Sequence, residues 1–172
     1  MKIAIVDDNE DDRKRLQEEI TNICDNKSRK DFEITEFFSG EDFINLIEKN
    51  ENKKYFDIVF LDIYMNGITG IETAKKLRET DNQSKIIFIT TSNEFASESY
   101  EVKAYDYLIK PFSKERILKT MERISEDEKN NKKILDLPDG QIIPIDSLLY
   151  TTFSGHYVTI YLIDGNKIQL RC

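Results

Sequence analysis

Cysteine and histidine are scarce in this chain, and long apolar runs are missing. Only two cysteines, Cys24 and Cys172, and one histidine, His156, occur among the 172 residues. The cysteines are far apart and form no CxxC pair, which argues against a zinc site or a disulfide framework. No apolar stretch approaches the roughly 20 residues of a membrane helix, and the N-terminal run IAIV is too short for a signal peptide. We therefore expect a cytoplasmic protein that makes no membrane contact.

An excess of positive charge is also missing. The formal net charge is −8, which argues against a chain that coats nucleic acid by bulk electrostatics, although a local basic patch could still do so. Hydrophobic residues make up 39% of the chain, as in a globular protein. The length predicts one complete domain plus a smaller piece.

The first 125 residues alternate between short apolar runs and amphipathic stretches. The third and fourth runs are almost continuously apolar, as expected for strands that are covered on both faces. Five units of a strand followed by a helix imply an α/β fold with a parallel sheet and helices on both of its faces. Strands are predicted at 2–6, 32–37, 56–61, 85–90 and 104–109, and helices at 10–24, 40–49, 70–80, 93–103 and 113–124.

The pattern changes after residue 125. The stretch SEDEKNNKK, residues 125–133, is charged and contains no aliphatic side chain, so it predicts a helix end followed by a linker. Beyond it, short strand-like runs separated by PDG, SG and DGN turns indicate a mainly-β region. Its 39 residues are marginal for an independent core, so we expect a truncated domain that continues past Cys172. The predicted parts are a domain at 1–125, a linker at 126–133 and a partial domain at 134–172.

Polar side chains stand at the ends of four predicted strands. Asp7 and Asp8 follow the first strand, Asp62 the third, Thr90 the fourth and Lys110 the fifth. The carboxyl ends of parallel strands meet at one edge of a sheet, so these groups should share a pocket. Taken singly, each has an ordinary explanation as a cap, a strand residue or a turn lysine. Their joint occurrence at one edge favours a functional site.

Three clustered carboxylates predict a site for a divalent cation. Clustered acids repel one another, and Mg²⁺, which prefers oxygen ligands, relieves the repulsion and keeps exchangeable waters. A central carboxylate can attack phosphorus and carry an acyl phosphate. The metal and a lysine then neutralise the phosphoryl oxygens, which is most of what phosphoryl transfer requires of a protein. The hydroxyl of Thr90 could bond a phosphoryl oxygen only when one is present, which makes it a candidate switch.

Four segments together resemble the receiver domain of two-component response regulators. They are KIAIVDDNEDDRKRL, FDIVFLDIYMNGITGIE, IIFITTS and AYDYLIKPF, and the resemblance covers about residues 2–125. It implies a doubly wound, flavodoxin-like fold of five βα units. It also implies Mg²⁺ as the cofactor and a sensor histidine kinase as the phosphoryl donor.

The resemblance gives each candidate residue a role. Asp62 matches the phosphoacceptor, and Asp7 and Asp8 match the acidic pair that holds Mg²⁺ together with it. Thr90 matches the switch hydroxyl, and Lys110 matches the lysine that contacts the phosphoryl group. These assignments come from the matching positions of the motifs.

Neighbouring positions follow the family with some departures. Pro111 matches a cis proline, Tyr107 matches the aromatic switch residue that moves inward with the threonine, and the main-chain carbonyl of Tyr64 matches a Mg²⁺ ligand. Asn66 stands where the family usually has proline, which loosens the loop and leaves its chemistry intact. Thr91 and Tyr64 are larger than the groups in many relatives, which leaves the phosphoryl lifetime open.

The second region resembles the opening strands of a LytTR DNA-binding domain. The match rests on the segment from Ile143 to Tyr150, a following loop and strand, and a DG turn, and it covers only the first portion of such a domain. It implies a transcription regulator in which phosphorylation promotes homodimerisation and DNA binding. His156 lies in the FSGHYV loop, where such domains place a DNA-contacting side chain; a plain turn histidine is the alternative.

The charge of the second region is a poor footprint for DNA. Two basic residues stand against four acidic ones between 134 and 172. If the LytTR resemblance holds, the basic contacts lie beyond Cys172, and this portion should bind DNA weakly or not at all.

Two other functions fit part of the pattern. A Mg²⁺-dependent phosphohydrolase with an aspartyl nucleophile would carry a DxD motif at a strand end, and neither VDDNE nor LDIYM supplies one. A receiver fold that serves only as a protein-interaction module, without phosphorylation, would not need the full set of acids, threonine and lysine. We therefore expect no enzyme activity beyond transfer of a phosphoryl group to the chain itself and its later loss.

Overall fold

The computed structural model describes residues 1–26, 32–49, 55–81, 83–92, 94–131 and 134–171. The chain divides into two compact units, Met1–Thr120 and Met121–Cys172. Within the described ranges, no helix is both long and apolar enough to cross a membrane. Cys24 is buried, whereas Cys172 lies outside the described residues, so the expected lack of a disulfide stays a prediction.

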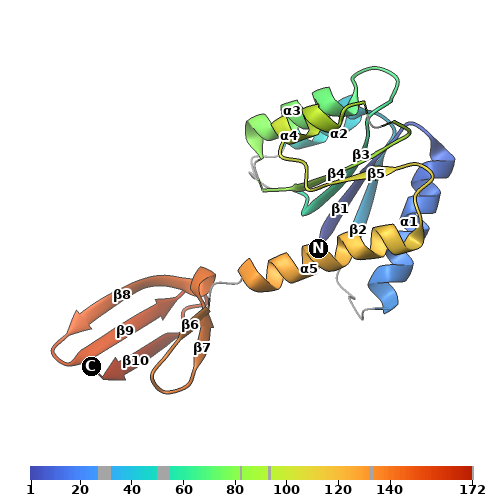
Figure 1. Cartoon of the computed structure of the whole chain (residues 1–172). Helices are drawn as coiled ribbons and strands as arrows, with labels where there is room; N and C mark the ends of the chain where they lie inside the picture. The colour runs from blue at the N-terminus through green and yellow to red at the C-terminus, as the bar shows by residue number, and fades with distance from the viewer. Residues whose placement is uncertain (27–31, 50–54, 82, 93, 132–133, 172) are drawn as a thin grey trace. The chain divides into compact units, whose positions relative to one another are not determined.

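The N-terminal unit contains a five-stranded parallel sheet in the order β2-β1-β3-β4-β5 (Figure 1). The chain turns back beside its first strand, so the strand order changes direction between β1 and β3. This arrangement confirms the predicted doubly wound α/β fold. The strands are β1 (Lys2–Val6), β2 (Glu33–Phe37), β3 (Ile58–Asp62), β4 (Lys85–Thr90) and β5 (Asp106–Ile109).

Helices cover both faces of this sheet. In Figure 1, α2, α3 and α4 lie over one face, and α1 and the start of α5 lie over the other. Local capping explains two of the starts: Ser39 caps α2, and Thr69 forms a reciprocal capping box with Glu72 at the start of α3. The helices are α1 (Glu10–Asn26), α2 (Gly40–Glu48), α3 (Gly70–Thr80), α4 (Ala96–Glu101) and α5 (Lys114–Asn131).

The central strands are buried on both sides, as their apolar sequences predict. All five residues of β3 are buried, and so are the last five of β4. On the face covered by α2 and α3, Val59, Leu61 and Phe88 pack in one core cluster with Phe43 and Leu77. This double burial holds β3 rigidly and fixes the place of its last residue, Asp62.

Two helix lengths differ from the predictions. α4 covers only Ala96–Glu101 instead of 93–103, because Phe95 offers no side-chain cap and Lys103 takes a left-handed conformation with φ of +49°. α5 continues to Asn131, beyond the predicted end at 124. The charged stretch after 125 contains no proline or glycine, so it carries the helix on. The first part of the predicted linker is therefore helical, and residues 132–133 lie outside the described residues.

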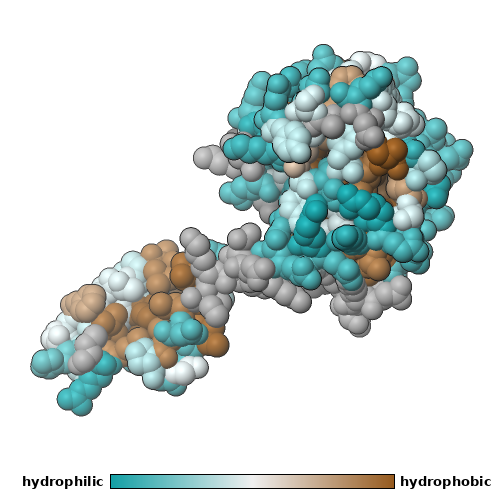
Figure 2. Space-filling model, in the orientation of Figure 1, coloured by the Kyte–Doolittle hydropathy of each residue, from teal (hydrophilic) through white to brown (hydrophobic). Residues whose placement is uncertain are grey.

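The C-terminal unit is mainly β, as predicted. A three-stranded antiparallel sheet has the order β10-β9-β8, and β6 and β7 form a separate hairpin. Leu137, Ile143 and Ile160 make its small core. Figure 2 shows much apolar surface on this unit. Leu149 and Phe153 are among its exposed apolar side chains. The strands are β6 (Ile134–Asp136), β7 (Ile142–Pro144), β8 (Leu148–Ser154), β9 (Tyr157–Leu162) and β10 (Lys167–Arg171), with a 3₁₀ turn at Ile145–Ser147.

Candidate functional site

The predicted acidic cluster forms at the carboxyl edge of the sheet. Val6 of β1 pairs with Leu61 of β3, so the residues that follow, Asp7 and Asp62, emerge side by side. One oxygen from each of Asp7, Asp8 and Asp62 lies within 4.8 Å of the others. Asp7 and Asp62 are buried, whereas Asp8 is only partly buried. The cluster therefore has a rigid base and one side that is open to solvent.

Hydrogen bonds hold these carboxylates in place. The main-chain N–H of Asn9 donates to Asp7 Oδ1 at 2.9 Å, and that of Tyr64 donates to Asp62 Oδ1 at 3.4 Å. Asp8 Oδ2 accepts from both the main-chain N–H and the side-chain amide of Asn66, at 2.9 and 2.7 Å. The sequence singled out Asn66 only as a departure from the family pattern. In the structure it orients the most exposed acid of the cluster.

Lys110 places one ammonium group among the acids. Its Nζ lies 2.7 Å from Asp7 Oδ2, 2.8 Å from Asp12 Oδ2 and 3.2 Å from Asp62 Oδ2. The lysine reaches this point from the end of β5, next to a cis peptide bond to Pro111, as predicted. Asp12, in the first turn of α1, was not singled out in the sequence, because an acid there is typical of helix starts.

The pKa values of the two central groups, Asp62 and Lys110, are both raised, although burial acts on them in opposite directions. Burial is the main cause that raises the pKa of Asp62 to about 6; the charge of Asp7 adds to the rise, and Lys110 opposes it. For Lys110, burial would lower the pKa, but hydrogen bonds to Asp12 and Asp7 outweigh it and raise the pKa above its ordinary value. The lysine therefore stays charged, whereas burial destabilises the ionised form of Asp62.

Thr90 lies at the end of β4 with its hydroxyl unsatisfied. The residue is fully buried, and among the described residues its Oγ1 has no hydrogen-bond partner. A buried hydroxyl without a partner is costly, so it is poised to bond an atom that enters the site. Tyr107, the other predicted switch residue, does not contact Thr90 through its hydroxyl. Its OH donates instead to the main-chain oxygen of Ser92 at 2.6 Å.

Tyr64 lies beside the site with an exposed ring. Its hydroxyl donates to Glu94 Oε2 at 2.8 Å. Its ring packs edge-on against the Phe95 ring, with 5.6 Å between the ring centroids. The hydrogen bond to Glu94 raises the pKa of the Tyr64 phenol. The predicted role of its main-chain carbonyl as a metal ligand stays a prediction.

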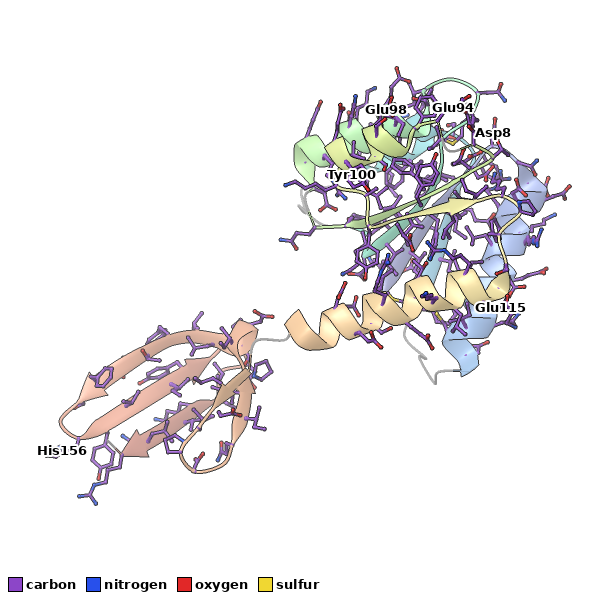
Figure 3. All side chains as sticks on the ribbon, viewed as in Figure 1. Asp8, Glu94, Glu98, Tyr100, Glu115 and His156 are labelled. Carbon is purple, nitrogen blue, oxygen red and sulfur yellow. The ribbon has the colours of Figure 1, made fainter. Side chains whose placement is uncertain are left out.

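His156 belongs to the C-terminal unit. It lies in the turn between β8 and β9 and is exposed (Figure 3). Its role in DNA contact stays a prediction.

Arg13 is a supporting residue that the sequence did not reveal. Its Nη1 donates to the main-chain oxygen of Asp7 at 2.6 Å, and its Nε lies 3.4 Å from Glu36 Oε2. The guanidinium also lies 4.2 Å from the ring centroid of Phe38. Although Arg13 is buried, its sequence context is an ordinary helix in a charged stretch, which gives no signal of this contact. Arg13 fixes the main chain at the acid next to β1.

The sequence predicts that the acidic cluster, including Asp7, holds Mg²⁺. On that prediction, replacing Arg13 with methionine should weaken Mg²⁺ binding about tenfold, the usual effect of removing a group that orients a metal ligand. Isothermal titration of the purified chain with Mg²⁺ measures this. Arg15→Met is a matched control, because Arg15 also bonds a carbonyl and stacks on a ring, but both belong to Phe112. Equal Mg²⁺ affinity in the two variants would contradict the role of Arg13.

The acidic cluster suits a hard divalent cation. The three acids offer carboxylate oxygens, and one acid is partly exposed, which leaves room for water or phosphate oxygens. The repulsion between Asp7 and Asp62 contributes to the raised pKa of Asp62, and a cation would relieve it. The residues present therefore fit a magnesium-type site.

Comparison with known proteins identifies the family of the N-terminal unit. Residues 3–122 match the response regulator receiver domain family. The response regulatory domain of protein mrkE from Klebsiella pneumoniae has a similar structure, with a TM-score of 0.65 and 26% identity over 76% of this chain and 100% of that one. The response regulator TrrA from Thermotoga maritima, solved in complex with Mg²⁺ and BeF, gives a TM-score of 0.58 and 28% identity over 72% of this chain and 97% of that one.

Curated relatives extend beyond the N-terminal unit. The sensory transduction protein LytT of Oceanobacillus iheyensis is 32% identical over 145 residues, which are 77% of this chain and 57% of the relative. The sensory transduction protein LytR of Staphylococcus epidermidis is 32% identical over 159 residues, which are 85% of this chain and 60% of the relative. The chain thus spans less than two thirds of the length of either relative. With most of its length matched to one domain family, the chain belongs to the response regulator receiver domain family.

Proposed function

We propose that Asp62 is the phosphoacceptor of a two-component signalling protein and that a sensor histidine kinase supplies the phosphoryl group. The observation that carries this proposal is the position of Asp62, buried at a strand end beside Asp7 and Asp8, with Lys110 Nζ 3.2 Å from its carboxylate. A nucleophile, a cation site and a fixed ammonium are the groups that phosphoryl transfer requires.

Asp7, Asp8, Asp62 and the main-chain carbonyl of Tyr64 would hold Mg²⁺. When bound, the ion would supply positive charge that stabilises the phosphoryl oxygens. Burial leaves the Asp62 carboxylate poorly solvated, which makes it a better nucleophile toward phosphorus. Lys110, whose Nζ lies 3.2 Å from Asp62 Oδ2, neutralises phosphoryl charge there. The chain itself receives the phosphoryl group, so this function does not require turnover of a separate substrate.

Thr90 and Tyr107 would convert phosphorylation into a change of shape. A phosphoryl oxygen on Asp62 supplies the hydrogen-bond partner that the buried Thr90 Oγ1 otherwise lacks. Movement of the end of β4 toward Asp62 carries Ser92 with it, and the Tyr107 hydroxyl follows through its bond to the Ser92 carbonyl. The face built from α4, β5 and α5 thereby changes and promotes homodimerisation.

Residues 134–172 would form the first part of a LytTR-type DNA-binding output, after a receiver at 1–125 and a connecting segment at 126–133. The names of the curated relatives LytT and LytR support this assignment, as does the mainly-β fold of the C-terminal unit. His156 at the β8–β9 turn is the side chain proposed to contact DNA. Phosphorylation would then regulate transcription through this output.

Incubation with acetyl phosphate tests the proposed acceptor. We expect the mass of the intact chain to rise by one phosphoryl group in Mg²⁺, peptide mapping to place the group on Asp62, and EDTA to prevent the reaction. A phosphoryl group found elsewhere, or one formed equally in EDTA, would contradict the proposal. Continuous release of phosphate from an ester would favour a phosphohydrolase. A folded chain that never becomes labelled would favour an interaction module.

A further inference from the structure

Asp12 contacts the lysine of the site, although no role in phosphoryl transfer was assigned to it. It lies in the first turn of α1, and its Oδ2 is 2.8 Å from Lys110 Nζ. The distance from Lys110 Nζ to Asp62 Oδ2 is longer, at 3.2 Å. The ammonium is therefore held nearer to Asp12 than to the proposed phosphoacceptor.

Helix capping does not account for the direction of the Asp12 side chain. Asn9 caps α1, because its Oδ1 accepts from the main-chain N–H groups of Asp11 and Asp12 at 2.9 and 3.1 Å. A carboxylate in the first turn is favourable next to the helix dipole, and both Asp11 and Asp12 satisfy that preference. Only the Asp12 carboxylate forms an ion pair with Lys110 among the described residues of α1.

Asp12 also lies apart from the proposed metal ligands. The group of acids whose oxygens approach within 4.8 Å of one another consists of Asp7, Asp8 and Asp62 among the described residues. Asp12 is one third exposed on its side chain, whereas Asp62 is 8% exposed. Asp12 therefore contacts the site through Lys110 and remains partly exposed to solvent.

Once Asp62 carries a phosphoryl group, the phosphoryl oxygens and the Asp12 carboxylate compete for the Lys110 ammonium. The phosphoryl group brings roughly two negative charges to Asp62, and Lys110 is the cation that already contacts that residue. To reach the phosphoryl oxygens, the ammonium has to lengthen or share its contact with Asp12. The negative charge of Asp12 also repels the phosphoryl group directly.

We propose that Asp12 is a positioning residue that holds the Lys110 ammonium back from Asp62 and thereby weakens the binding of a phosphoryl group there. The inference rests on the proposed role of Asp62 as phosphoacceptor. Because the Asp12 carboxylate is partly exposed, its effect is moderate. Asp12→Asn should tighten the binding of a phosphoryl mimic about fivefold.

Isothermal titration with beryllofluoride at saturating Mg²⁺ tests the proposal on the full chain. We expect Asp12→Asn to lower the dissociation constant about fivefold and Asp11→Asn to change it less than about twofold. Asp11 is the matched control, because it is the adjacent exposed acid of the same helix turn, whereas the ion pairs of Lys110 among the described residues are with Asp7, Asp12 and Asp62. Equal affinity of Asp12→Asn and the wild type would overturn the inference and leave the proposed phosphoacceptor intact.

A Lys110→Gln background separates positioning from plain repulsion. If Asp12 acts through the lysine, adding Asp12→Asn to Lys110→Gln should change the affinity less than about twofold, whereas a persistent fivefold gain would overturn the proposal. Failure of the wild type itself to bind beryllofluoride in Mg²⁺ would overturn the proposed function together with this inference. Urea unfolding of each variant shows whether the fold is retained.

Discussion

Replacing Gly70 with alanine is expected to destabilise the N-terminal unit by about 3 kcal/mol and to prevent phosphorylation of Asp62. In an ordinary helix the same change would stabilise by about 1 kcal/mol. Here a Cβ at position 70 would overlap the main-chain oxygen of Asp62 and lie 2.8 Å from its carbonyl carbon and 2.9 Å from Ile63 Cα. These are backbone atoms, so they cannot move aside without displacing the end of β3. The close approach also brings the Gly70 N–H to the Ile63 carbonyl at 3.0 Å.

Gly40→Ala provides the matched control for this prediction. The nearest atoms to a Cβ at position 40 belong to the side chains of Thr73 and Ile68 and not to β3. Thr73 is buried and its hydroxyl donates to the Thr69 main-chain oxygen, so this contact also costs stability. We expect a loss of about 2 kcal/mol but normal phosphorylation, because the backbone of β3 is untouched. Urea unfolding followed by circular dichroism measures stability, and mass spectrometry after acetyl phosphate treatment measures labelling. A Gly70→Ala variant as stable and as readily labelled as Gly40→Ala would show that β3 and α3 are less tightly constrained.

The position of Asp62 could be predicted from the sequence because two simple patterns coincide there. The apolar run before it specifies a doubly covered strand, and strand ends of a parallel sheet converge on one edge. Asp7 and Lys110 follow from the same rule, since each stands at the end of another strand. The strand order of the structure explains why Asp7 and Asp62 are neighbours, because β1 lies directly between β2 and β3.

The supporting contacts could not be predicted, because they depend on side-chain paths rather than on periodicity. Arg13, Asp12 and Asn66 each occupy a position whose local sequence has an ordinary explanation in a helix or a loop. Their contacts with Asp7, Lys110 and Asp8 arise only when α1 and the loop after β3 pack against the sheet edge. The helix at α4 was predicted, but its length was overestimated, because the local sequence gives no sign of the left-handed φ at Lys103.

Asp62→Asn is expected to abolish phosphorylation and, in metal-free buffer, to make the protein more stable than the wild type at pH 8. The pKa of Asp62 is raised from 3.8 to about 6, mainly by burial. Because the folded state holds this proton more tightly than the unfolded state, the wild type loses stability as the pH rises from about 4 to above 6. A rise of about two in pKa corresponds to about 3 kcal/mol.

Asparagine carries no charge to desolvate, so the variant should escape this loss. Lys110 keeps its ion pairs with Asp7 and Asp12 in the variant, so the ammonium is not left unpaired.

Urea unfolding in EDTA should therefore give nearly equal stabilities at pH 4 and a gap of about 3 kcal/mol in favour of Asp62→Asn at pH 8. Mg²⁺ should narrow the gap by binding the wild-type acids, since a ligand of the folded state stabilises it. Asp25→Asn, an exposed acid at the end of α1, should differ from the wild type by less than about 0.5 kcal/mol at both pH values. A stability difference that stays constant between pH 4 and pH 8 would mean that burial does not destabilise the ionised form of Asp62. The proposal that burial makes this carboxylate a better nucleophile would then be wrong.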